Sequence, residues 1–171
     1  MRKSKIINFL IPSFFGLCIP YLFYILIPIN MPINRFPWAF LANSAGLSFI
    51  IFGILNVIVS ARIIYGHLDT PLWDKPPEKL AVYGPYRYCR NPMTLGFLAI
   101  LLGEGLFFKS IGILIWTVVF LIVSIFLIIK IEEPSLRRKF GKEYDDYFRR
   151  TPRWISLNYS YHKQHNYKRN L

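Results

Sequence analysis

The sequence predicts an all-α integral membrane protein with four transmembrane helices and a cytoplasmic C-terminal amphipathic helix. Two features of composition indicate this class: 54% of the 171 residues are apolar and 18% are charged, whereas a soluble domain carries roughly 25% charged residues. The third observation is that Lys and Arg gather at the ends of long apolar runs, which is the distribution that sets membrane topology. The length allows a single domain, covering residues 1–171.

The net charge of +12 does not indicate a nucleic-acid partner, because the basic residues flank apolar runs instead of following one face of a soluble fold. The same runs exclude intrinsic disorder. No metal is expected, since no histidine has companions at metal-ligand spacing; the histidines are His67, His162 and His165. Cys18 lies in an apolar run and Cys89 in a basic loop, so we expect no disulfide between them.

Each predicted span is a run of about 17–25 mostly apolar residues, enough to cross about 30 Å of hydrocarbon. The four runs cover residues 6–29, 38–64, 92–108 and 111–131. The first run follows a basic segment, but it is longer than the core of a signal peptide and lacks a small-residue cleavage site, so we expect a retained span. Only Lys109 and Ser110 separate the last two runs, which predicts an antiparallel helical hairpin.

The positions of Lys and Arg predict the orientation of the spans. A cytoplasmic N-terminus places a cytoplasmic loop at residues 65–91 and a cytoplasmic tail at residues 132–171, and leaves only Arg35 and Lys109 on the other side. This bias predicts that both termini are cytoplasmic, and that the membrane is the plasma membrane if the source is prokaryotic.

The two cytoplasmic segments hold the candidate chemistry. Pro and Gly residues predict an irregular path through the loop, while apolar residues at helical spacing predict one amphipathic helix from Ser135 to about Arg150. Pro134 should bend or break the fourth span before this helix. The TPRWI segment should follow as a strap, with Arg153 able to reach the Glu pair at 132 and 133 or a ligand carboxylate. Because the hairpin brings its cytoplasmic ends together, Asn91 and Glu132 should share one cleft at the membrane surface.

Two motifs at these ends resemble the signature of a known family. GPYRYCRNPMTLG, followed by EEPSLRRKFGKEYDDYFRRTPRWI, is similar to the integral-membrane methyltransferases that include isoprenylcysteine carboxyl methyltransferase and the phospholipid N-methyltransferases. The preceding PPEKLAVYG is similar to the lead-in of bacterial and archaeal relatives. The resemblance covers about residues 70–155, with both motifs in order and one helical hairpin between them.

The resemblance implies S-adenosylmethionine as cofactor, held between the loop, the start of the third span and the Glu pair. The positions that match the cofactor pocket of the family are Glu78, Lys79, Leu80, Ala81, Tyr86, Asn91, Pro92, Met93, Thr94 and Glu132. Arg90, Glu133 and Arg153 join them as candidates on chemical grounds, because guanidinium groups suit the methionyl carboxylate and carboxylates suit its ammonium group. No catalytic residue is assigned.

Three departures from the family pattern concern the acceptor. Asn91 replaces the usual histidine of an Arg-His-Pro motif, Thr94 replaces a frequent tyrosine, and Ile128 stands where the isoprenylcysteine enzymes carry a substrate-contacting arginine. We therefore expect a lipidic or apolar methyl acceptor, whether carboxylate, thiol or amine, and do not assign prenylcysteine. The alternative is a non-catalytic membrane protein, structural or carrier, that retains the fold.

Overall fold

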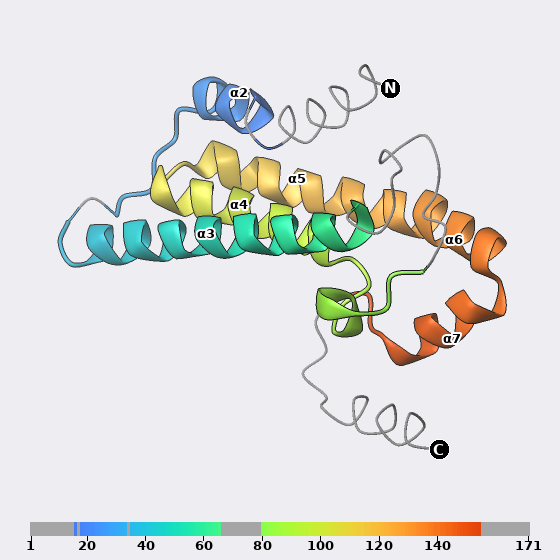
Figure 1. Ribbon diagram of the computed structural model, residues 1–171. Helices are drawn as coiled ribbons and strands as arrows, with labels where there is room; N and C mark the ends of the chain where they lie inside the picture. Colours follow the sequence, from blue (N-terminus) through green and yellow to red (C-terminus); the bar gives the residue numbers. More distant parts are fainter. Residues whose placement is uncertain (1–15, 17, 34, 66–79, 155–171) are drawn as a thin grey trace, which may run out of the picture.

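The computed structural model describes residues 16, 18–33, 35–65 and 80–154, which are mostly helical and form no strand (Figure 1). The elements are α2 (Ile19–Leu26), α3 (Trp38–Tyr65), the 3₁₀ turn η2 (Gly84–Arg87), α4 (Pro92–Phe107), α5 (Ile111–Leu127), the π-helical segment η3 (Ile128–Glu132), α6 (Glu133–Phe140) and α7 (Lys142–Arg150). An isolated β-bridge joins Asn30 to Ser110.

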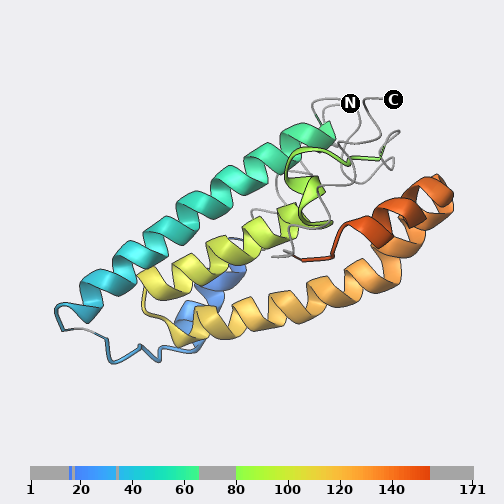
Figure 2. The same cartoon turned by 90° about the horizontal axis from the view of Figure 1, so that it is seen from below.

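Helix α4 lies between α3 and α5 and is antiparallel to both (Figure 2). The turn from α4 to α5 passes through Lys109, which has a φ of 52°, and Ser110, whose side-chain oxygen accepts a hydrogen bond from the backbone N–H of Ile113 at 3.3 Å. This side chain caps the first turn of α5. The predicted antiparallel hairpin is thus confirmed, and α2 packs against α5 near the same turn.

Glycines bring α3 and α4 unusually close together. A Cβ atom added to Gly53 would lie 2.6 Å from the carbonyl oxygen of Gly96, and one added to Gly46 would lie 2.7 Å from that of Gly103. The spacing of seven residues on each helix places both pairs along one seam. Small residues allow this backbone approach, which is a common way for helices to associate in membranes.

Two helices in the described part of the chain are long and apolar enough to cross a membrane: Trp38–Ile64, and Ile111–Phe140, which runs continuously through α5, η3 and α6. Many large apolar side chains of α3 are exposed, among them Phe49, Phe52 and Leu55, and such a surface is compatible with lipid rather than water. Helix α4 is shorter and is also apolar. The first predicted span lies partly outside the described residues, so a total of four crossings stays a prediction.

Pro134 was expected to break or bend the fourth span, and the helix does not break there. Glu133 has helical dihedral angles (φ −59°, ψ −45°), and its backbone N–H donates to the carbonyl of Ile128, five residues earlier. A π-turn immediately before a proline provides the space that the proline ring requires, so the helix continues.

The single amphipathic helix predicted from Ser135 to Arg150 is also wrong, because Gly141 divides it into α6 and α7. Gly141 has φ 51° and ψ −124°, a backbone conformation that favours glycine. The chain reverses here, and α7 folds back toward the loop that precedes α4 (Figure 2).

Candidate functional site

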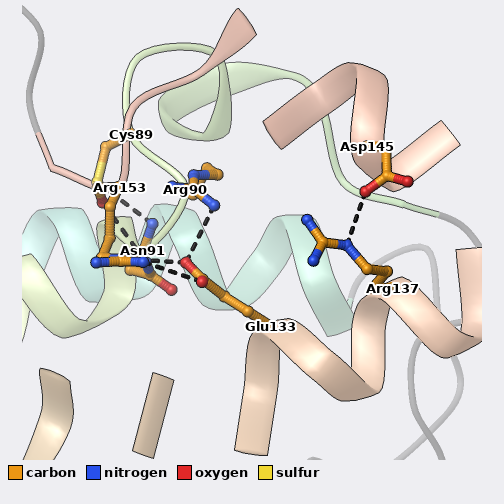
Figure 3. Close-up of polar contacts among 7 residues, drawn as sticks. All are labelled: Cys89, Arg90, Asn91, Glu133, Arg137, Asp145 and Arg153. Carbon is orange, nitrogen blue, oxygen red and sulfur yellow. Dashed lines mark hydrogen bonds and ion pairs between the residues drawn. The ribbon is translucent and has the colours of Figure 1, made fainter. Parts of the chain in front are cut away.

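Three segments meet beside the N-terminus of α4. They are the end of the preceding loop at Cys89–Asn91, the start of α6 at Glu133, and residues 151–154 after α7, which we call the strap (Figure 3). The hairpin explains this meeting, because the start of α4 and the end of α5 are neighbours at one end of the antiparallel pair.

Glu133 binds two arginines. Its Oε1 accepts from Arg90 at 3.0 Å and from Nε of Arg153 at 2.9 Å, while its Oε2 accepts from Nη2 of Arg153 at 3.0 Å. The Arg153 contact is bidentate, the strong arrangement for a guanidinium and a carboxylate. The hydrogen bond to Glu133 is the main reason that the pKa of Arg153 is raised. The prediction that Arg153 reaches the Glu pair is confirmed, and its partner is Glu133.

Arg90 is the more buried arginine, with 8% of its side chain exposed. Its guanidinium carbon lies 4.0 Å from the centre of the Phe148 ring on α7, a cation–π contact. Its Nε is buried and has no hydrogen-bond partner among the described residues. An unpartnered buried donor of this kind is costly unless something accepts from it, so Nε of Arg90 is a candidate donor to a ligand.

Backbone and thiol contacts attach the strap to the loop. The N–H of Arg90 donates to the carbonyl of Pro152 at 2.9 Å, and the Cys89 thiol donates to the carbonyl of Arg153 at 3.2 Å. The side-chain amide of Asn91, also buried, lies 3.5 Å from that carbonyl oxygen. Burial raises the pKa of the Cys89 thiol, which keeps it protonated and able to donate. Both cysteines are free, as expected.

A buried tyrosine fixes α7 to η2. The Tyr147 hydroxyl donates to the backbone carbonyl of Tyr86 at 2.8 Å, and both tyrosines are buried. Desolvation is the main reason that the pKa of Tyr147 is raised, so its hydroxyl stays protonated. Burial also raises the pKa of Tyr144, which is 2% exposed. The aromatic residues of α7 are therefore packing residues, and their packing holds the loop around η2 in place.

Glu132 differs from its neighbour. It is exposed, and it has no hydrogen bond or ion pair with any residue that the structure describes. The two adjacent carboxylates thus have separate environments. Glu133 is neutralised by two arginines, whereas the carboxylate of Glu132 has no partner among the described residues and is free to bind a ligand.

The remaining predicted site residues lie near this cluster or outside the described chain. Glu78 and Lys79 fall outside the described residues. Pro92 is buried as the first residue of α4, Met93 and Thr94 follow half-buried in its first turn, and Leu80 and Ala81 are half-buried before η2. Whether these residues bind a cofactor stays a prediction.

Two residues that hold the cluster together were not among the predicted site residues. Cys89 was considered only as a free thiol and Phe148 only as packing, and neither sequence position carries a signal for the contact that it makes. The Arg137–Asp145 ion pair, 2.7 Å long, is solvent-exposed and lies apart from the cluster (Figure 3).

Long apolar helices with a polar cluster at one end define a membrane-associated protein. The chain belongs to the phospholipid methyltransferase family, which matches residues 32–143, more than half of its length. The resemblance expected from the two motifs is therefore confirmed, and the chain belongs to a class of membrane methyltransferases. The match extends into α7 and ends before the strap. No curated protein and no solved structure matches the chain.

Proposed function

We propose that this protein is an S-adenosylmethionine-dependent methyltransferase that acts at the membrane on a lipidic or apolar acceptor. Two observations carry the proposal: Nε of Arg90 is buried without a partner among the described residues, and Glu132, the sequence neighbour of the glutamate that Arg90 binds, has an unpaired carboxylate. A zwitterion complements this pair of groups.

The residues present fit the methionyl end of the cofactor. Arg90 suits its carboxylate, through a charge-assisted hydrogen bond, and Glu132 suits its ammonium group. When bound, the cofactor would supply an electrophilic methyl group on a sulfonium. The chain's own contribution is to orient that group and exclude water, effects that supply roughly 7–11 kcal/mol in well-oriented reactions.

The length of α4 supports a lipidic acceptor. Its 16 residues span about 24 Å at 1.5 Å per residue, less than the roughly 30 Å of hydrocarbon in a bilayer. A crossing by α4 therefore places Pro92, and the cluster next to it, at the boundary between hydrocarbon and headgroups. An acceptor anchored in the bilayer reaches that depth without leaving the membrane.

The proposed topology has four crossings with both termini in the cytoplasm, in the plasma membrane if the source is prokaryotic. It rests on the distribution of Lys and Arg. Labelling of a cysteine introduced at position 165 tests it: the topology requires protection from an impermeant reagent in intact cells, and labelling from outside refutes it.

Cofactor binding is the direct test of the function. Titration calorimetry in detergent should detect S-adenosylmethionine and S-adenosylhomocysteine, and Glu132→Gln or Arg90→Gln should each weaken binding by about 10-fold, the effect of losing one charge-assisted hydrogen bond. Asp146→Asn, an equivalent change at an exposed carboxylate of α7, should not. Absence of binding to the wild type at millimolar ligand refutes the proposal.

Transfer of a labelled methyl group separates the enzyme from a non-catalytic protein that retains the fold. Incubation with labelled S-adenosylmethionine and a membrane lipid extract should give a labelled product in the lipid phase. Binding without transfer, across lipid, small thiol and amine acceptors, would favour the carrier or structural alternative.

A further inference from the structure

Glu133 lies at the centre of the contacts between the loop, α6 and the strap. One carboxylate oxygen joins Arg90 to Arg153, and the other completes the bidentate contact with Arg153. All three groups are largely buried, with exposed side-chain fractions of 8% for Arg90, 14% for Glu133 and 28% for Arg153. A carboxylate with two guanidinium partners has little capacity left for a ligand.

Arg90 is held in place from three directions. Its backbone N–H donates to Pro152, the ring of Phe148 lies against its guanidinium, and Glu133 accepts from its Nη1. These contacts fix the direction of Nε, which is buried and has no hydrogen-bond partner among the described residues. Two of the three come from α7 and the strap, which the bidentate Arg153–Glu133 contact ties to α6.

We propose that Glu133 is a positioning residue: by anchoring the strap through Arg153 it orients Arg90 toward the ligand carboxylate, and neither Glu133 nor Arg153 touches the ligand. This proposal rests on the proposed function for the identity of the ligand, and it assigns the two adjacent glutamates different roles. It also removes Glu133 and Arg153 from the set of cofactor-binding residues expected from the sequence.

Cys89 reports whether the strap is attached. Cys89 is 3% exposed and its thiol donates to the carbonyl of Arg153, so a reagent reaches the thiol only when the strap opens. With Cys18→Ser, Cys89 is the single cysteine of the chain. The rate of maleimide labelling then measures strap opening with no cofactor present.

The first arm of the experiment measures this labelling. Glu133→Gln and Arg153→Gln should each raise the rate about 10-fold, corresponding to about 1.4 kcal/mol of lost strap contact, and Arg153→Lys should recover part of the protection. Asp145→Asn removes the exposed Arg137–Asp145 pair in the same region and serves as the matched control, with an unchanged rate. Unchanged labelling in both Gln variants overturns the proposal.

The second arm measures S-adenosylhomocysteine affinity in a double-mutant cycle. Glu133→Gln should weaken binding about 10-fold in the wild-type background and not at all in an Arg90→Gln background, because the two changes then remove the same interaction. Equal losses in both backgrounds mean that Glu133 contacts the ligand itself and overturn the proposal. If Glu133→Gln fails to fold, Arg153→Gln in the same cycle replaces it.

The two arms separate the two failures. A wild type that binds no S-adenosylhomocysteine refutes the proposed function and with it the positioning role. Normal binding with no loss in Glu133→Gln or Arg153→Gln refutes the positioning role alone.

Discussion

Replacing Gly53 with valine should separate α3 from α4. A Cβ atom at this position would lie 2.6 Å from the carbonyl oxygen of Gly96 and 2.9 Å from the backbone nitrogen of Ile100. The first distance is about 0.8 Å below the 3.4 Å at which ordinary van der Waals contact begins. Both atoms belong to the backbone of α4, so the conflict is relieved only by moving one helix.

The size of the effect follows from this geometry. Inserting methylenes into a packed interface costs about 1–3 kcal/mol, and occasionally more; valine adds two carbons beyond the Cβ, so we expect a loss of about 3 kcal/mol. The control is Ala45→Val, on an exposed position of the same helix, where an equally β-branched side chain meets lipid or detergent and should change stability by less than about 0.5 kcal/mol.

Reversible unfolding in mixed micelles, followed by circular dichroism as the fraction of denaturing detergent rises, measures both variants. Gly53→Val should unfold at a clearly lower fraction than the wild type, and Ala45→Val at the same fraction. Equal stability of the two variants would refute the close helix approach. Because α4 begins at the cluster, Gly53→Val should also weaken cofactor binding.

Three further predictions concern the end of the molecule that carries the arginine–glutamate cluster. Tyr147→Phe leaves the buried carbonyl of Tyr86 without its donor, so it should cost about 1–3 kcal/mol of unfolding free energy in the same assay; an unchanged stability would contradict the contact. Gly141→Ala forces a Cβ into a backbone with φ 51° and should cost about 1–3 kcal/mol, although nothing lies within 4 Å of that Cβ, so a crowding effect is excluded. Because burial raises the pKa of Cys89, its thiol contributes stability below the unfolded-state pKa, which is about 8.5, and this stability falls as the pH rises toward the folded-state pKa. Alkylation by iodoacetamide should therefore need a higher pH than for a model thiol, and reaction at the pH of a model thiol would show that the site is open.

The helices were predictable because apolar length and proline position determine where they begin. The expected starts at Trp38, Pro92 and Ile111 are the starts of α3, α4 and α5, and the short connection at Lys109 and Ser110 fixed the hairpin. These features depend only on local geometry and on the cost of exposing backbone polar groups to hydrocarbon, and both can be read from the sequence.

The errors share one physical origin. Apolar periodicity continues across Gly141, so the pattern carries no break, and only the backbone conformation of that glycine creates the turn. The effect of Pro134 was overestimated because the π-turn before it, which removes the steric conflict, has no distinct sequence signal.

The roles of the Glu pair were not separable from sequence. Adjacent helical residues point about 100° apart, so Glu132 and Glu133 cannot share one partner set, but which of them meets Arg90 depends on the helix rotation. The strap contacts made by Cys89 and Asn91 likewise come from tertiary packing. The residue types predicted an ionic cluster, and the fold determined which glutamate binds the two arginines.

The π-turn at η3 means that the long helix Ile111–Phe140 holds one residue more than α-geometry would place in the same length. If this turn changed to regular α-bonding with no residue removed, every residue after it would rotate by about 100° relative to α5 and shift by about 1.5 Å along the axis. Glu133 would face away from Arg90 and Arg153 while the apolar surface of α5 remained intact. The π-turn therefore sets a phase angle as well as a length, because its bonding pattern determines the direction in which Glu133 points.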